Sequence, residues 1–103
     1  MAYKLKITQA AHDDLDEILY YITKQLANPS AAAKLLAQIE ECYAQLMSFP
    51  FLYEACRDAR LQSLGYHKVT FGNYVMVFQP SEPDQTVYIL RFFYGGRNYE
   101  SML

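Results

Sequence analysis

Residues 66–79, with the sequence YHKVTFGNYVMVFQ, decide the fold that this sequence predicts. Two runs of alternating side chains, 66–71 and 74–79, flank the pair Gly72 and Asn73. Alternation with a period of two is typical of strands, and such a pair between two strands indicates a tight hairpin turn. We therefore expect an antiparallel hairpin, with Lys68 on one face and His67 on the other.

Two further strands are predicted on either side of this hairpin in the sequence. Residues 86–94 form the longest apolar run and follow turn-forming residues at 80–84. A strand this apolar is expected near the centre of a sheet, covered on much of both faces. Residues 3–7 alternate apolar and polar, which predicts an N-terminal strand with one buried face. Gly95 and Gly96 end the central strand and leave a tail that reaches Leu103.

Two helices are predicted between the first strand and the hairpin. Thr8 can cap a helix whose apolar residues recur at helical spacing as far as Leu26, and the acidic residues at 13–17 suit its positive end. Asn28 and Pro29 indicate a stop and a new start, so the second helix covers residues 29–47. The short connection predicts an antiparallel helical hairpin. Residues 50–60 are expected to form an irregular crossover.

The predicted order is therefore β-α-α-β-β-β, an α+β fold with a helical hairpin packed on a mostly antiparallel, twisted sheet. A length of 103 residues suits one domain over residues 1–103. We find no apolar run of roughly 18 residues that could cross a bilayer. The N-terminus lacks the apolar core of a signal peptide. These observations predict a cytoplasmic protein without a membrane partner.

Composition points to contact with another protein. Nine Lys and Arg face eleven Asp and Glu, for a net charge of −2. Proteins that hold nucleic acid on their own usually carry a basic excess, so we expect contact with DNA only through a partner. Ten Tyr and six Phe make up 16% of the chain. Tyrosine, with its apolar ring and polar tip, suits surfaces that are covered and uncovered in turn.

The sequence offers little for cofactor chemistry. Cys42 and Cys56 have no metal-binding spacing, and we interpret them as reduced, partly buried thiols that bridge only if the fold brings them together. His12 has no second ligand at metal-binding spacing. A nucleophilic serine motif and a phosphate-binding glycine loop are both absent. No metal and no cofactor are expected. The acidic residues at 13–17 are interpreted as a solvated helix start.

Four basic residues stand out on the predicted sheet and tail. Arg91 interrupts an apolar strand, where a charge needs a partner or a route to solvent. Arg97 follows two glycines, so the backbone is free to turn its side chain toward a groove. Lys68 and His67 lie in the hairpin. Ordinary edge positions are the alternative explanation for Lys68 and His67, and a solvated tail charge is the alternative for Arg97.

Six short motifs follow one another along the chain. They are AHDDLDEILYYI at 11–22, NPSAA at 28–32, LMSFP at 46–50, LGYHK at 64–68, NYVMVF at 73–78 and VYILRFFYGGRNYE at 87–100. Each motif alone is weak, but their joint order and spacing resemble the RelE/ParE toxin superfamily over nearly the whole chain. The resemblance implies the toxin of a bacterial type II toxin–antitoxin module, which serves plasmid stabilisation or stress response through growth inhibition.

The resemblance also implies partners. A cognate antitoxin would cover the toxin with a helix or an added strand, and would supply the DNA-binding part of the complex. The expected assemblies are a homodimer or a heterotetramer with the antitoxin.

Two activities occur in the superfamily. ParE-like members inhibit DNA gyrase by binding it, without enzymatic chemistry. For such a toxin we expect Arg91, Arg97, Tyr99 and Tyr74 to contact the target. The tail from residue 97 to 103 resembles the ParE ending, so ParE-like binding is our first hypothesis. A third hypothesis is a member that binds its antitoxin and poisons nothing.

RelE-like members are ribosome-dependent messenger RNA endoribonucleases, and this activity is the alternative. Here Lys68 and Arg97 would hold the phosphate, while His67 or Tyr99 would move protons, without a metal. Two departures from the RelE pattern weaken this alternative. Val75 stands where many RelE members keep an arginine, and the terminal tyrosine of that group has no counterpart in register, Tyr99 being several residues away.

Overall fold

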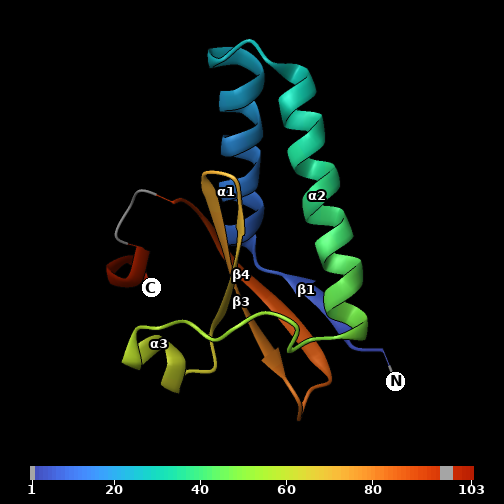
Figure 1. Cartoon of the computed structure of the whole chain (residues 1–103), viewed down its shortest axis with the longest axis vertical. Coiled ribbons are helices and arrows are strands. Elements are labelled where there is room, and N and C mark those ends of the chain that lie inside the picture. The colour runs from blue at the N-terminus through green and yellow to red at the C-terminus, as the bar shows by residue number, and fades with distance from the viewer. Residues whose placement is uncertain (1, 96–98) are drawn as a thin grey trace.

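A four-stranded mixed sheet with a helical hairpin on one face forms the centre of the molecule (Figure 1). The computed structural model describes residues 2–95 and 99–103. The elements are β1 (Lys4–Ile7), α1 (Gln9–Tyr20), a π-helical turn η1 (Tyr21–Gln25), α2 (Pro29–Ser48), α3 (Ala59–Ser63), β2 (His67–Phe71), β3 (Tyr74–Ser81), β4 (Thr86–Tyr94) and a 3₁₀ turn η2 (Tyr99–Met102). The predicted α+β class and the order of the strands and of the helical hairpin are confirmed.

The strands lie in the order β1-β4-β3-β2, so β4 is an inner strand, as its apolar run predicts. β4 pairs in parallel with β1 and antiparallel with β3. Between β3 and β4 the register shifts: Val77 faces Arg91 and Phe78 faces Ile89, which leaves Leu90 as an extra residue in a β-bulge. The bulge matters for the site because it sets which face carries Arg91.

Local capping signals place both long helices. The Thr8 side chain accepts a hydrogen bond from the main-chain nitrogen of Ala11, and the Asn28 side chain accepts one from that of Ala31. The predicted caps are therefore confirmed. The first helix does not continue to Leu26 as a regular α-helix, because its last turn widens into η1.

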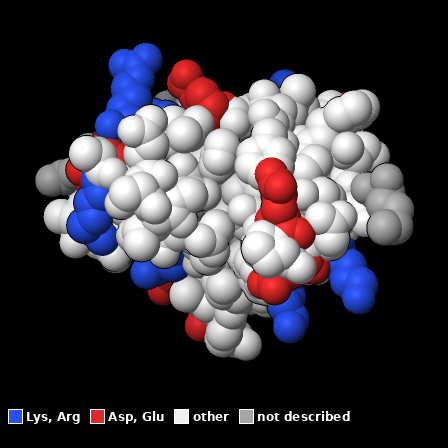
Figure 2. Space-filling view, turned by 90° about the horizontal axis from the view of Figure 1, so that it is seen from below, with Lys and Arg blue, Asp and Glu red and all other residues white. Residues whose placement is uncertain are grey.

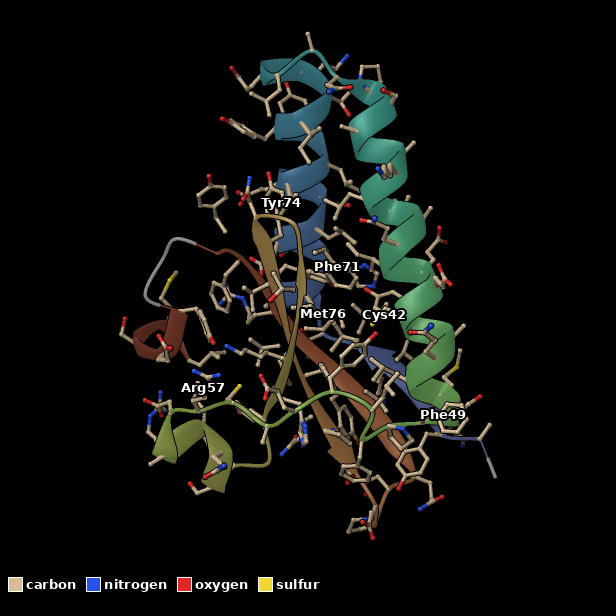
Figure 3. All side chains as sticks on the ribbon, viewed as in Figure 1. Cys42, Phe49, Arg57, Phe71, Tyr74 and Met76 are labelled. Carbon is tan, nitrogen blue, oxygen red and sulfur yellow. The ribbon has the colours of Figure 1, made fainter. Side chains whose placement is uncertain are left out.

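Apolar side chains cover both faces of the sheet. α1 and α2 pack on one face, where Cys42, Phe71 and Met76 point into the space between α2 and the sheet (Figure 3). On the opposite face, Cys56 of the crossover, Leu61 of α3 and Tyr99 of the tail pack on β3 and β4. The two thiols are free and buried in different clusters, so the fold does not bring them together.

The structure corrects two boundaries of the predicted elements. The crossover that we expected to be irregular over residues 50–60 ends in a short helix, α3, which begins at Ala59 and is capped by the Asp58 side chain. β3 also runs through Pro80, which we assigned to a turn, and ends at Ser81. Pro80 is tolerated there because β2 pairs with β3 no further than Phe78, which leaves an open edge where a missing N–H costs nothing.

Candidate target-binding surfaces

The sheet face that carries Lys68 is hollowed into a groove between β2 and the C-terminal segment. The groove has a volume of about 440 Å³, and it is lined by Lys68, Thr70, Gly72, Asn73, Val75, Tyr94, Gly95 and Tyr99. Burial raises the pKa of the Cys56 thiol on this face, and the charge of Lys68 opposes part of that rise. The structure thus brings Lys68 and Tyr99 to one groove. An ammonium group beside polar side chains can hold an anion such as a phosphate or a carboxylate.

Tyr99 belongs to the core of this face as well as to the groove. Only 8% of the residue is exposed, and its ring stacks on Phe93 with the ring centroids 5.8 Å apart. Arg60 holds the tail in place, because its guanidinium donates to the main-chain carbonyls of Glu100 at 2.8 Å and Leu103 at 3.3 Å. Arg97, the other tail residue that we predicted to act here, lies outside the described residues.

His67 lies on the opposite face of the hairpin from Lys68. Its ring stacks on Phe78, with centroids 5.7 Å apart, and meets Phe51 edge-on. Nδ1 of His67 lies 2.9 Å from the carbonyl oxygen of Tyr53. The structure therefore does not bring His67 to the groove, and the ring is committed to packing and to a main-chain contact.

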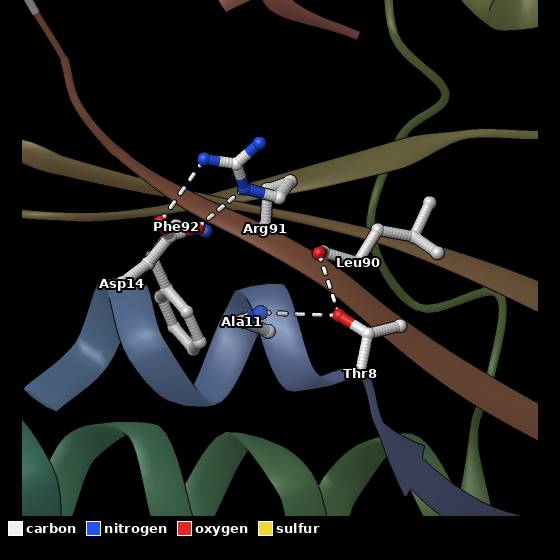
Figure 4. A network of polar contacts seen from close by, with 6 residues as sticks. All are labelled: Thr8, Ala11, Asp14, Leu90, Arg91 and Phe92. Carbon is white, nitrogen blue, oxygen red and sulfur yellow. Dashed lines mark hydrogen bonds and ion pairs between the residues drawn. The ribbon is translucent and has the colours of Figure 1, made fainter.

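Arg91 finds its partner in Asp14, at the edge of β4 (Figure 4). Its Nε donates to Oδ2 of Asp14 at 2.6 Å and its Nη2 donates to Oδ1 at 3.1 Å. These hydrogen bonds raise the pKa of the guanidinium, and the side chain also lies over the Phe93 ring at 5.1 Å. Arg91 is therefore tied to α1, with 32% of its side chain exposed.

Asp14 corrects our interpretation of the acidic residues at 13–17 as a solvated helix start. Only 15% of its side chain is exposed, and Oδ2 also accepts the main-chain N–H of Phe92 at 3.0 Å. β1 pairs with β4 only as far as Ile89, so the N–H of Phe92 has no strand partner on that side. Asp14 replaces that partner. The sequence carries no signal for this pair, because 77 positions separate Asp14 from Arg91.

Tyr74 lies in a second hollow, between α1 and the C-terminal end of β4. The cleft has a volume of about 530 Å³ and is lined by Glu17 and Ile18 of α1, Tyr21 of η1, Tyr74 of β3 and Tyr94 of β4. The rings of Tyr74 and Tyr94 meet edge-on with centroids 5.7 Å apart. Sequence reasoning singled out Tyr74 but missed Glu17, Tyr21 and Tyr94. The excess of tyrosine was the only signal for Tyr21 and Tyr94, and Glu17 had none.

On the face of the molecule that Figure 2 shows, the described cations do not gather into one patch. Lys and Arg side chains on this face are separated by uncharged surface and lie among acidic ones. Within residues 2–95 and 99–103, Arg60 and Arg91 are engaged by acceptors of the chain itself. The same residues hold no group of three or more side chains arranged to ligate a metal ion. None of the described helices combines the length and apolarity needed to span a bilayer.

Solved structures with the same architecture are toxins of toxin–antitoxin pairs. A chain of the chromosomal ParDE system of P. aeruginosa matches with a TM-score of 0.68 and 24% identity, over 90% of this chain and 96% of that one. A chain of a RelBE complex of Mycobacterium tuberculosis matches with a TM-score of 0.63 and 21% identity, over 91% of this chain and 99% of that one. A chain of the intact E. coli RelBE complex matches with a TM-score of 0.64 and 13% identity, over 93% of this chain and 100% of that one.

These likenesses define the class: the protein has the RelE/ParE fold. A family model described as the ParE toxin of the type II toxin–antitoxin system parDE matches residues 5–99. The chain therefore belongs to the ParE toxin family. No curated protein matches significantly. Our expectation of a toxin of a type II toxin–antitoxin system is confirmed at this level.

Proposed function

We propose that the protein is a ParE-like toxin that inhibits DNA gyrase by binding it and that a cognate antitoxin neutralises. The observation that carries the proposal is the match of residues 5–99 to the ParE toxin family. The solved relatives from P. aeruginosa, M. tuberculosis and E. coli are toxin–antitoxin pairs, which supports a cognate antitoxin.

The groove also supports binding over catalysis. Cleavage of RNA without a metal needs cations for the charged phosphorane, together with a base and an acid within reach. Among the described residues, Lys68 is the only cation that lines the groove. His67 faces the other side of the sheet, Arg91 is paired with Asp14, and Tyr99 is packed on Phe93.

The test is supercoiling by purified gyrase in the presence of the purified toxin. We expect inhibition at micromolar toxin, and recovery when the antitoxin is added first. Arg97→Ala should raise the concentration for half inhibition about tenfold, as expected for one interfacial arginine. Arg57→Ala is the matched control, because Arg57 is exposed and does not line the groove. Full supercoiling at micromolar wild-type toxin would contradict the proposal.

The alternative, a ribosome-dependent endoribonuclease, is favoured by one observation: Lys68 and Tyr99 line the same groove. Primer extension on translated messages after induction tests it. If this alternative holds, wild-type toxin produces new 5′ ends and the double variant Lys68→Ala, Arg97→Ala does not. Cleavage that survives in the double variant removes these residues from any catalytic role.

A further inference from the structure

The tyrosine cleft, defined by Tyr21, Tyr74 and Tyr94 with Glu17 and Ile18, has the chemistry of a site for a cation (Figure 3 labels Tyr74). Ring faces carry negative potential and attract a guanidinium or ammonium group. Glu17 adds a full negative charge at the same place. Within residues 2–95 and 99–103, no Lys or Arg lines the cleft.

The polar groups of the cleft are unpaired within the part of the chain that the structure describes. The carboxylate of Glu17 takes part in no ion pair or hydrogen bond there, in contrast to the carboxylate of Asp14 one turn earlier. The hydroxyls of Tyr21, Tyr74 and Tyr94 are close enough that Tyr21 and Tyr94 contribute to raising the pKa of Tyr74, after burial. A ligand with several N–H donors would satisfy these groups together.

The backbone is tied together next to the cleft. The main-chain nitrogen of Gly95 donates to the carbonyl of Asn73, which ties the end of β4 to the hairpin turn beside Tyr74. A side chain at position 95 would lie 2.9 Å from that carbonyl oxygen, so only glycine allows this approach. The opposite wall, at Tyr21, begins the π-helical turn η1, a distortion that often accompanies functional sites.

We propose that the tyrosine cleft binds an arginine side chain of the cognate antitoxin. Arginine fits better than lysine because its planar guanidinium stacks on rings while its N–H groups reach a carboxylate. The surface around the cleft argues for a lasting partner: Tyr20, Tyr21 and Tyr94 are 63%, 47% and 51% exposed. Apolar surface of this kind is better covered by a constant partner than by a transient one. The inference rests on the proposed antitoxin partnership.

The first experiment tests the chemistry of the cleft without the antitoxin. The isolated toxin is titrated with Nα-acetylarginine amide, and with the neutral citrulline amide as control, while NMR follows the ring signals of Tyr21, Tyr74 and Tyr94. We expect saturable shifts with the arginine probe alone, weakened in Glu17→Gln and retained in Asp16→Asn. Asp16 is the matched control because it is an exposed acid on the same helix outside the cleft. Equal shifts with both probes, or none, would overturn the proposal.

The second experiment measures the affinity of toxin for antitoxin by calorimetry. Tyr94→Ala and Tyr74→Ala should each weaken binding about tenfold. Leu64→Ala, which removes an exposed apolar side chain outside the cleft, should not. Circular dichroism checks that each variant is folded, and Tyr94→Phe, which keeps the ring, should bind nearly as the wild type does. Glu17→Gln should weaken binding of the wild-type antitoxin, and it should have no effect once the contacting antitoxin arginine is replaced by alanine.

The outcomes separate the cleft from the proposed function. Antitoxin affinity that is unchanged in both Tyr→Ala variants overturns the proposal, as does loss of gyrase inhibition in those variants with antitoxin affinity intact. If wild-type toxin binds no antitoxin at all, the partnership itself fails. In that case an antitoxin arginine cannot be the ligand of the cleft, and the probe titration still decides whether the cleft selects a guanidinium.

Discussion

The hydroxyl of Tyr43 is buried on α2 without a hydrogen-bond partner among the described residues. A buried polar group that lacks a partner costs roughly 1–3 kcal/mol of stability. We therefore expect Tyr43→Phe to raise the free energy of unfolding by about 1 kcal/mol at neutral pH. Urea denaturation measures it. Tyr53→Phe is the matched control and should lose stability slightly, because the Tyr53 hydroxyl donates to Gln45 at 3.1 Å. A clear loss in Tyr43→Phe would indicate a partner for that hydroxyl.

The same residue predicts a difference at high pH. Burial raises the pKa of Tyr43 from 10.0 to about 12. Because the folded-state pKa lies above the unfolded one, the unfolded state ionises first, so the stability of the wild type falls as the pH rises from about 10 to 12. The Phe variant has no such group. The stability gap between variant and wild type should therefore widen between pH 10 and 12, and a constant gap would contradict this assignment.

At the scale of elements, α1 is fastened to the unpaired edge of β4. The Thr8 hydroxyl donates to the carbonyl of Leu90 at 2.8 Å, and Asp14 takes both Arg91 and the N–H of Phe92. Beyond the end of β1, these side chains therefore satisfy main-chain groups of β4 that a neighbouring strand would otherwise pair with. The edge is closed to pairing with another chain, which edge strands otherwise invite.

Asp14→Ala tests this fastening. It removes three hydrogen bonds and leaves Arg91 without its partner, so we expect a loss of about 2–3 kcal/mol in the free energy of unfolding. Asp14→Asn should lower the free energy of unfolding by less, because the amide oxygen can still accept a hydrogen bond from the N–H of Phe92. Asp13→Ala is the control: Asp13 is exposed and its carboxylate accepts, among the described residues, only from Gln9, so the loss of stability should stay within about 0.5 kcal/mol. Similar losses in both alanine variants would show that the Asp14 contacts add little.

The elements that the sequence predicted are those with local signals. Thr8 and Asn28 cap helices within three residues of themselves, and Gly72 adopts the positive φ of 57° that a tight turn requires. The short helix α3 was missed because five residues carry too little periodicity to detect. β3 was predicted too short because Pro80 normally marks the end of a strand.

The features of the candidate sites that could be predicted are likewise those with a local sequence signal. Alternation along β2 placed Lys68 and His67 on opposite faces, which is what the structure has. The pairing of Asp14 with Arg91, and the meeting of Glu17 with Tyr74 and Tyr94, depend on how α1 docks on the sheet. No pattern within either segment encodes that docking, so the tyrosine cleft could not be predicted from the sequence.

At the scale of the whole molecule, two groups of exposed apolar side chains lie away from the groove and the tyrosine cleft or at their margins. Tyr20, Tyr21 and Leu26 are exposed toward the far end of the helical hairpin, and Phe49 and Phe51 are exposed where α2 meets the crossover. Exposed apolar surface of this kind marks sites of protein contact. The aromatic excess is thus divided between core and surface, whereas Arg91, which we expected on the uncovered surface, is committed to Asp14.

The charge of the whole chain leads to a prediction about DNA. Affinity for DNA comes largely from cations that neutralise phosphates, and a protein with six to ten such contacts shows a steep dependence on salt. This chain has a net charge of −2, and two of its arginines are held by its own acceptors. We therefore expect the toxin alone to leave the anisotropy of a labelled promoter duplex unchanged at micromolar protein and physiological salt. The toxin–antitoxin complex should bind the same duplex, with the antitoxin supplying the cations. Tight, salt-sensitive binding by the toxin alone would contradict this, and would point to a basic surface formed with Arg97, which lies outside the described residues.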